Sequence, residues 1–401
     1  MSRAASAAGA APAMHAGLDG ELSPWQRRAW DQACAAMDAG RLAHGLLICG
    51  PADLGKRALA ERLARRMLCL QRAAGTQAPD ADACGQCRSC QLFAQRVQYD
   101  PAETRPDGSF SHPFGRSAHP DLHLVGFEIN DRTGKPRSEI VIEQIRRLSE
   151  KLALTPQYGG ERGAQVAILE PADAINHHAC NALLKTLEEP QPGRYLWLVT
   201  ADPARLSATV RSRCQRIELR LPGEVEAMDW LRGLGHAEAT AREALDAARG
   251  HPGLAARWLA EGGLALRREV AADLAALRKG ERAPSEVAQR WAAEDPEPRL
   301  RHAADLALAE ATRLGGGPST QMPADAAQPA GARLTDVRRI RTLAAWFDAA
   351  NRTRGLLRTT VRADLALVAL LVQWREAGGA GRTPPASAAP GRPSSQSGAR
   401  R

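Results

Sequence analysis

Apolar residues follow two different periods in residues 164–214, and these periods define the elements predicted there. Residues 166–169 and 195–200 are short, continuously apolar runs, a pattern typical of fully buried strands. Pro190 ends the helix between them, and residues 217–219 give a third strand. That helix has one apolar face, made of residues at helical spacing: Ile175, Ala179, Ala182, Leu183 and Leu187. This order predicts a parallel sheet with crossover helices.

The chain before this stretch continues the same pattern. Ser23 suits the N-cap and Pro24 the first position of a helix that runs to Gly40. Residues 98–118 are polar with scattered Pro and Gly, and we expect a mobile insertion loop there. The other predicted elements are a strand at 44–49, a helix at 57–70, a strand at 119–125 and a helix at 140–152. Short, Ala-rich helices follow Pro222.

The bulk composition is that of an ordinary soluble protein, with 44% hydrophobic and 25% charged residues among 401. The net charge of +9 is compatible with nucleic-acid contact, although arginines of the C-terminal tail contribute to it. The apolar run at 365–372 is too short to cross a bilayer. We therefore expect a cytoplasmic protein whose 8 cysteines are reduced unless a metal holds them.

Four cysteines have the spacing of a metal site. Cys84, Cys87 and Cys90 supply three thiolates from one tight loop, and Cys69 supplies a fourth from the end of the preceding helix. Four thiolates suit tetrahedral Zn²⁺ in a closed, structural site. An iron–sulfur cluster is the rival, but its patterns need a further cysteine shortly after the third, and Gln91 follows Cys90 instead.

A glycine-bounded loop after the strand at 44–49 has the setting of a phosphate-binding P-loop. Gly50, Gly55 and Lys56 occupy its motif positions, where backbone N–H groups and an ammonium can hold phosphates at a helix N-terminus. Arg57 stands where a Ser or Thr hydroxyl would ligate magnesium, and a guanidinium cannot do so. Two interpretations of the loop stay open: it still binds a nucleotide, or its glycines only make a tight strand-to-helix turn.

Three motifs resemble those of a known family. They are N-A-L-L-K-T-L-E-E-P at 181–190, T-A-D-P at 200–203 and S-R-C at 212–214. Through these motifs the chain resembles the clamp-loader branch of the AAA+ proteins and, within it, the delta-prime subunits of bacterial DNA polymerase III. The resemblance covers about 22–374 and is strongest in 43–90 and 164–214.

The resemblance implies an α/β AAA+ core with a parallel sheet, an inserted zinc module, a helical lid and a helical collar. The implied domains are the core at 21–222 with its zinc module at 69–90, the lid at 223–282 and the collar at 283–378 with a flexible loop at 315–332. We expect a disordered extension before them at 1–20 and a disordered tail after them at 379–401. The family carries a zinc module in this place, which agrees with the cysteine pattern.

The resemblance also implies that hydrolysis is lost. Glu170-Pro171 stands where active members have Asp-Glu, and the lid break at 250–255 lacks their arginine. Asp173 is a weaker substitute for the missing carboxylate. In the family, the arginine of the S-R-C motif enters the ATP site of a neighbouring subunit, which assigns the arginine finger to Arg213, with Ser212 and Cys214 beside it. Arg211 does not match the motif position.

The implied function is that of a stator subunit of the sliding-clamp loader in DNA replication, without ATPase activity of its own. It would belong to the polymerase III holoenzyme, a nucleotidyltransferase complex. Its partners would be gamma/tau and delta subunits, the sliding clamp and primed DNA. A hydrolysing gamma/tau-like motor and a loader-independent zinc-containing DNA-binding protein are the alternatives.

Two surfaces are also predicted. Arg62, Arg65 and Arg66 point away from the apolar side of their helix, which predicts a solvated basic face. The C-terminal helices carry more apolar residues than one small bundle is expected to bury, and the resemblance implies that they associate with other subunits: Leu343, Trp346, Phe347, Leu365, Leu367, Leu370 and Leu371.

Overall fold

The computed structural model describes residues 20–73, 82–106, 108–130, 132–158, 163–315, 334–357 and 361–378. The chain forms two compact units, which divide between Glu261 and Gly262. Residues 1–19 of the extension predicted at 1–20, residues 316–332 of the loop predicted at 315–332 and the whole tail at 379–401 lie outside the described residues.

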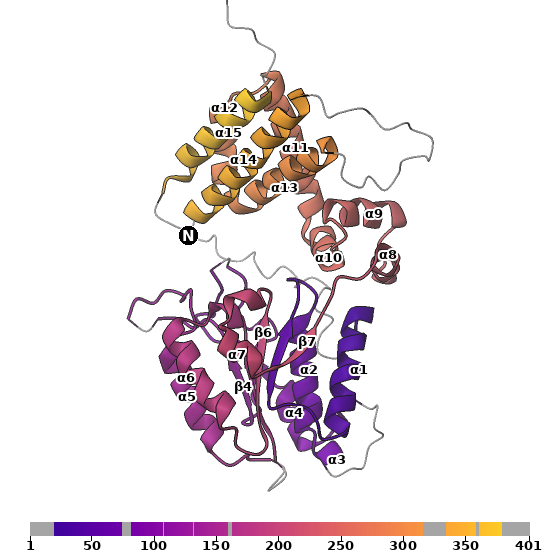
Figure 1. Ribbon diagram of the computed structural model, residues 1–401, viewed down its shortest axis with the longest axis vertical. Helices are drawn as coiled ribbons and strands as arrows, with labels where there is room; N and C mark the ends of the chain where they lie inside the picture. The colour runs from indigo at the N-terminus through magenta and orange to yellow at the C-terminus, as the bar shows by residue number, and fades with distance from the viewer. Residues whose placement is uncertain are drawn as a thin grey trace, which may run out of the picture. The chain divides into compact units, whose positions relative to one another are not determined.

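Unit 1 is an α/β layer structure around one parallel sheet of five strands in the order β4-β5-β6-β1-β7 (Figure 1). The strands are β1 (Gly45–Cys49), β4 (Leu122–Val125), β5 (Gln165–Leu169), β6 (Arg194–Thr200) and β7 (Gln215–Glu218). Its main helices are α1 (Pro24–Asp38), α2 (Lys56–Leu68), α4 (Arg88–Ala94), α5 (Ile142–Ala153) and α6 (His177–Glu188). Shorter or later helices are α3 (Leu70–Ala73), α7 (Ala208–Ser212), α8 (Glu224–Gly233), α9 (Glu238–Ala247) and α10 (Pro252–Glu261). The predicted parallel sheet with crossover helices is confirmed.

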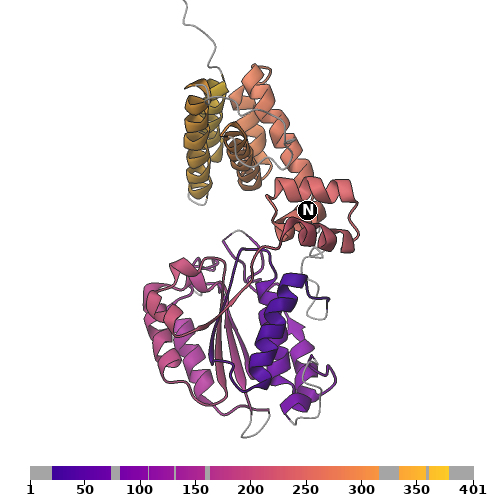
Figure 2. The ribbon, with the colours of Figure 1, turned by 45° about the vertical axis from the view of Figure 1, so that its right-hand side comes forward.

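Alternate residues of each central strand enter two separate cores, one on each face of the sheet. In β1, Leu46 and Ile48 face α1, α2 and α4, whereas Leu47 and Cys49 face α5 and α6. Figure 2 shows the two helical layers on opposite sides of the sheet. Because both faces are covered, the strands need continuous apolar sequence, which is why their runs are so easily found.

The arginines of α2 do not form the predicted solvated face. Arg66 is only 2% exposed, and its Nη2 lies 2.8 Å from an Oδ2 of Asp38 in α1. Arg62 and Arg65 both pair with Asp82. The prediction is therefore wrong for this helix, since its arginines tie α2 to the neighbouring chain segments.

Residues 96–106 and 108–117 form a packed hairpin, which we call the strap. Its base is a two-stranded antiparallel ladder between β2 (Arg96–Val97) and β3 (Arg116–Ser117). Within it, Ser111 and His112 are 0% and 1% exposed. A loop was correctly predicted for most of this segment; its described residues are packed, and the mobility expected for it stays a prediction.

The described residues of unit 2 form helices and their short connections. The unit contains α11 (Gly263–Lys279), α12 (Pro284–Ala293), α13 (Pro296–Leu314), α14 (Leu334–Leu356) and α15 (Ala363–Gly378). Leu343, Trp346, Leu367, Leu370 and Leu371 are buried in its single core together with residues of α11, so the predicted excess of apolar surface is wrong for them. Phe347 is partly buried against this core, and Leu365 is 58% exposed.

The unit boundary falls inside the predicted lid, because α11 contributes Val270, Leu274 and Leu277 to the core of unit 2. A separate lid and collar therefore stay predictions. Among the described helices, none is long and apolar enough to cross a membrane.

One buried carboxylate organises unit 2. Asp273 is 1% exposed and accepts hydrogen bonds from Arg282 Nη1 at 2.5 Å, from Trp291 Nε1 at 2.9 Å and from Arg290. Trp291 is itself fully buried, so its N–H has no access to water if the carboxylate is lost.

We expect Asp273→Ala to lower the free energy of unfolding by about 3 kcal/mol, because a buried N–H and two cations lose their acceptor. The measurement is chemical denaturation of the full chain. Glu281→Ala, which removes an exposed ion pair with Lys279, is the matched control and should change stability by less than about 0.5 kcal/mol. Equal effects of the two substitutions would contradict the role given to Asp273.

Candidate functional site

Residues 50–57 form the predicted strand–turn–helix junction between β1 and α2. Gly50 has φ 140°, and a Cβ there would lie 2.1 Å from the carbonyl oxygen of Leu219. Gly55 has φ 77° at the N-cap of α2, and a Cβ there would lie 2.3 Å from Nε2 of Gln26. Both positions therefore require glycine, as the sequence pattern indicated.

Helix α1 holds this loop from outside. Trp25 Nε1 donates to the carbonyl of Leu54 at 3.1 Å, and Gln26 Nε2 donates to the carbonyl of Gly55 at 3.0 Å. Ser23 is the N-cap of α1 and Pro24 its first residue, as predicted. The cap places Gln26 on the loop, since its Oε1 accepts from the Ser23 N–H.

The phosphate-binding lysine is turned onto its own loop. Lys56 is 7% exposed, and its Nζ donates to the carbonyl of Pro51 at 2.6 Å. Burial lowers the pKa of Lys56, while the nearby carboxylates of Glu170 and Asp53 oppose that shift. An ammonium in this position satisfies a backbone acceptor instead of pointing to open solvent.

Arg57 lies buried at the position of the missing hydroxyl. Its Nε lies 2.5 Å from Oε1 of Glu61, its Nη1 lies 3.2 Å from Oε2 of Glu170, and its Nη2 lies 3.4 Å from Nδ1 of His112. Burial disfavours its charge, but the carboxylates of Glu61 and Glu170 outweigh that effect and raise the pKa of Arg57. The two departures from the motif, Arg57 and Glu170, are thus directly paired.

Glu170 has a second cationic partner, Arg105 of the strap, whose Nη2 lies 3.2 Å from the same oxygen, Oε2. Asp173, the weaker candidate for a catalytic carboxylate, accepts the hydroxyl proton of Thr200. Sequence reasoning missed Arg105 and His112, because nothing in a single sequence links the strap to β5.

Helix α10 covers the tip of the loop. Gly253 packs so tightly that a Cβ there would lie 1.8 Å from the carbonyl oxygen of Asp53. Arg257 Nη1 lies 3.0 Å from Oδ1 of the same aspartate. The segment 250–255 indeed lacks an arginine, but Arg257 reaches the loop from the next helical turn, a residue that the sequence analysis did not single out.

Cys69, Cys84, Cys87 and Cys90 come together as predicted, with all four sulfurs within 4.8 Å of one another. Backbone N–H groups point at three of the sulfurs: Cys84 N at Cys69 Sγ (3.4 Å), Cys87 N at Cys84 Sγ (3.3 Å) and Cys90 N at Cys87 Sγ (3.5 Å). Such donors stabilise thiolates, and they are a main reason that the pKa of Cys84 is lowered to about 7. Burial alone would raise it. The cluster can hold a metal ion.

Arg213 lies at the C-terminal end of α7, on the surface. Its side chain is 35% exposed, with Nη2 at 2.6 Å from Oε1 of Glu188, which is 46% exposed. Its Nη1 donates to the carbonyl of Thr209 at 3.0 Å. Ser212 Oγ donates to that same carbonyl, and burial raises the pKa of Cys214 to about 11.

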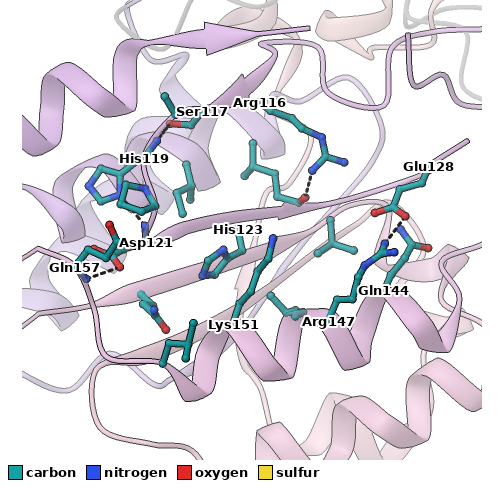
Figure 3. Close-up of a pocket in the computed structure, with 18 of the residues that line it drawn as sticks. Arg116, Ser117, His119, Asp121, His123, Glu128, Gln144, Arg147, Lys151 and Gln157 are labelled. Atoms are coloured by element: carbon teal, nitrogen blue, oxygen red, sulfur yellow. Dashed lines mark hydrogen bonds and ion pairs between the residues drawn. The ribbon is translucent and has the colours of Figure 1, made fainter. Parts of the chain in front are cut away.

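A hollow of about 470 Å³ lies along β4, between α5 and the base of the strap (Figure 3). Most of its charged groups already have partners: Arg147 pairs with Glu128 at 2.5 Å, and Asp121 accepts from the backbone N–H groups of Gln157 and Tyr158. Lys151 also lines it. These contacts fix the walls, and no predicted site residue lies in the hollow.

Two sequence comparisons point to the same family. Residues 25–222 match a family described as DNA polymerase III, delta subunit. The DNA polymerase III subunit delta' of Pseudomonas aeruginosa is 36% identical over 275 residues, which cover 68% of this chain and 71% of that protein. The corresponding subunit of Haemophilus influenzae is 32% identical, with 60% and 62% covered. A solved gamma-subunit-related protein from Thermotoga maritima aligns with a TM-score of 0.38 at 15% identity, covering 87% of this chain and 99% of that one.

The buried histidine of the strap predicts acid sensitivity. Burial, helped by Arg57, Arg116 and Arg105, lowers the pKa of His112 to about 2. An unfolded chain binds a proton there below pH ~6.5, and the folded chain does not, so stability falls as the pH falls below that value. We expect His112→Asn to reduce the loss of stability between pH 6 and pH 5 by about 1 kcal/mol. Chemical denaturation at both pH values measures this.

The exposed His178 provides the control. His178→Asn should leave the pH dependence unchanged, because His178 is an exposed residue of α6, outside the strap. If His112→Asn has the same pH dependence as the parent chain, His112 is not buried in its neutral form.

Proposed function

This chain belongs to the family of DNA polymerase III delta-prime subunits, and on that premise we propose that it is a non-hydrolysing stator of a sliding-clamp loader in DNA replication. It would supply Arg213 in trans to the ATP site of a neighbouring subunit. Its partners would be gamma/tau and delta subunits, the sliding clamp and primed DNA, in the cytoplasm.

The ion pair between Arg57 and Glu170 carries this proposal. Hydrolysis of a nucleoside triphosphate needs a magnesium ion on a hydroxyl of the P-loop and a carboxylate at the end of another strand of the sheet, which here is β5. In this chain the first position carries a cation, and the second has its charge taken up by that cation. A site built in this way favours a subunit that acts on its neighbour's nucleotide.

The surroundings of Arg213 support its role as the finger. A guanidinium pairs bidentately with phosphate oxygens and stays charged at every physiological pH. Arg213 keeps this fork at the surface, where its partner Glu188 is also exposed, so the pair can separate without leaving a buried charge. Arg211 instead donates to the carbonyls of Pro203 and Ala204, which holds it against its own loop.

We further propose that the four-cysteine cluster holds structural zinc. The sulfur separations fit a tetrahedral ion with Zn–S bonds of about 2.3 Å, which places sulfurs about 3.8 Å apart, and Cys84 Sγ and Cys90 Sγ lie 3.9 Å apart. Four protein ligands leave no open position for substrate, so the ion would fix the end of α2 against α4.

The first experiment measures single-turnover ATP hydrolysis in the assembled loader, with clamp and primed DNA. We expect Arg213→Ala to lower the rate about a thousandfold at the one site that it completes, because the charge on the transferring phosphoryl group loses its cation. The loader should still assemble. Arg211→Ala is the matched control and should retain the parental rate.

The isolated chain should show no hydrolysis. Clear turnover by the chain alone, abolished by Lys56→Ala, would identify a motor subunit and refute the proposal. So would an assembled Arg213→Ala loader that hydrolyses ATP at every site with the parental rate.

The metal proposal predicts one zinc per chain by mass spectrometry of the acid-digested protein. Cys87→Ser should remove the metal or weaken its binding by orders of magnitude, because one thiolate of the closed site is lost. Cys180→Ser, outside the cluster, should keep one equivalent. Iron in place of zinc, or full metal content in Cys87→Ser, would count against a four-thiolate zinc site.

A further inference from the structure

The strap is tied to the core at several points along its length. Arg96 Nη1 lies 2.6 Å from Oε2 of Glu61, which is 0% exposed on α2. Arg105 Nη2 lies 3.2 Å from Oε2 of Glu170, and Arg116 Nη1 donates to the carbonyl of Leu124 on β4 at 3.1 Å (Figure 3). The strap therefore spans from the P-loop helix to the edge of the sheet.

The strap also packs against the end of β4. A Cβ on Gly126 would lie 2.5 Å from Oγ of Ser111 and 2.9 Å from the carbonyl oxygen of Glu170. Only a residue without a side chain permits this approach, so the core is shaped to receive the strap. His112, next to Ser111, accepts from Arg57 through Nδ1 at 3.4 Å.

Within the strap, backbone hydrogen bonds hold Arg105 in place. Its N–H donates to the carbonyl of Ser109 at 2.7 Å, and the N–H of Ser111 donates to the carbonyl of Glu103 at 2.8 Å. Glu103 in turn pairs with Arg116 at 2.9 Å. The hairpin therefore positions the guanidinium of Arg105 against Glu170.

Two cations lie against one oxygen of Glu170. Its Oε2 lies 3.2 Å from a nitrogen of Arg57 and 3.2 Å from a nitrogen of Arg105. A carboxylate that serves a magnesium ion or an attacking water does so through its negative charge. Here guanidinium groups from two parts of the chain take up that charge.

We propose that the strap is a built-in plug of the nucleotide site, in which Arg105 acts together with Arg57 to neutralise Glu170 and to keep magnesium-bound nucleoside triphosphates out. The inference rests on the proposed non-hydrolysing role and goes beyond it, because it assigns a task to residues 96–117. Replacing Arg57 alone is then insufficient to open the site.

Equilibrium binding of a magnesium-bound, non-hydrolysable ATP analogue to the full chain tests this. The parent and Arg57→Thr should not bind it measurably, whereas Arg57→Thr with Arg105→Ser should bind at least tenfold more tightly than Arg57→Thr. Arg57→Thr with Arg132→Ser is the matched control, because Arg132 is an exposed arginine outside the strap. Adding Lys56→Ala to the double variant should abolish binding. Equal affinity of the single and double variants, or no binding by the folded double variant, overturns the proposal.

A second measurement does not depend on substituting the buried Arg57. In Arg105→Ser, amide hydrogen exchange at Arg105's neighbours in the strap, such as Ser111, should accelerate about tenfold, while the amides of β5 and β6 stay unchanged. Arg132→Ser should leave strap exchange at the parental rate. Unchanged exchange in Arg105→Ser would show that the ion pair with Glu170 does not hold the strap and would refute the plug.

The two proposals fail in different experiments. Binding of magnesium-bound nucleotide by Arg57→Thr alone would refute the plug and leave the role of Arg213 in trans intact. Loss of that role would appear as unchanged hydrolysis in the assembled Arg213→Ala loader, whatever the isolated chain binds.

Discussion

A guanidinium that is removed from water needs carboxylate partners. In this protein the buried guanidinium is that of Arg57, which is 4% exposed. It pairs with Glu61, one turn further along α2, and with Glu170, at the end of β5. Glu61 and Glu170 are then shared with Arg96 and Arg105 of the strap. The burial of one cation thus fixes the relative positions of a helix, a strand and a hairpin.

The loop at 50–57 has become a structural junction through these and other contacts. Trp25 and Gln26 hold it from α1, Gly253 and Arg257 press on its tip from α10, and Lys56 satisfies one of its carbonyls. In nucleotide-binding P-loops, phosphates accept hydrogen bonds from the backbone N–H groups of the loop. Here side chains from α1, α2 and α10 bind the carbonyls of the loop and the carboxylate of Asp53, so the protein fixes the junction from its other side.

The sequence was sufficient for the features that depend on local pattern. The strand predicted at 166–169 is observed as β5, Gln165–Leu169, because a strand buried on both faces must be continuously apolar. The four cysteines were found from spacing alone, since a metal site needs several sulfur ligands in one place.

Features that depend on distant partners could not be predicted. The outward arginines of α2 look like a solvated face until Asp38 and Asp82 are placed beside them. The polar strap is typical of a loose loop in composition, and its packing depends on a glycine at 126 and on acids from α2 and β5. Arg257 lies outside the expected motif position, and only the packing of α10 brings it to Asp53.

The pair between Arg213 and Glu188 has a consequence for assembly. An arginine that waited in water would have to lose its hydration shell when it entered a neighbour's phosphate site. Arg213 already has one carboxylate oxygen 2.6 Å from its Nη2, so docking would exchange one anion for another. The liberated Glu188 would then be rehydrated at the surface. The pair with Glu188 would thereby offset part of the desolvation cost of the interface. It would also restrict the conformation of the Arg213 side chain before the partner arrives.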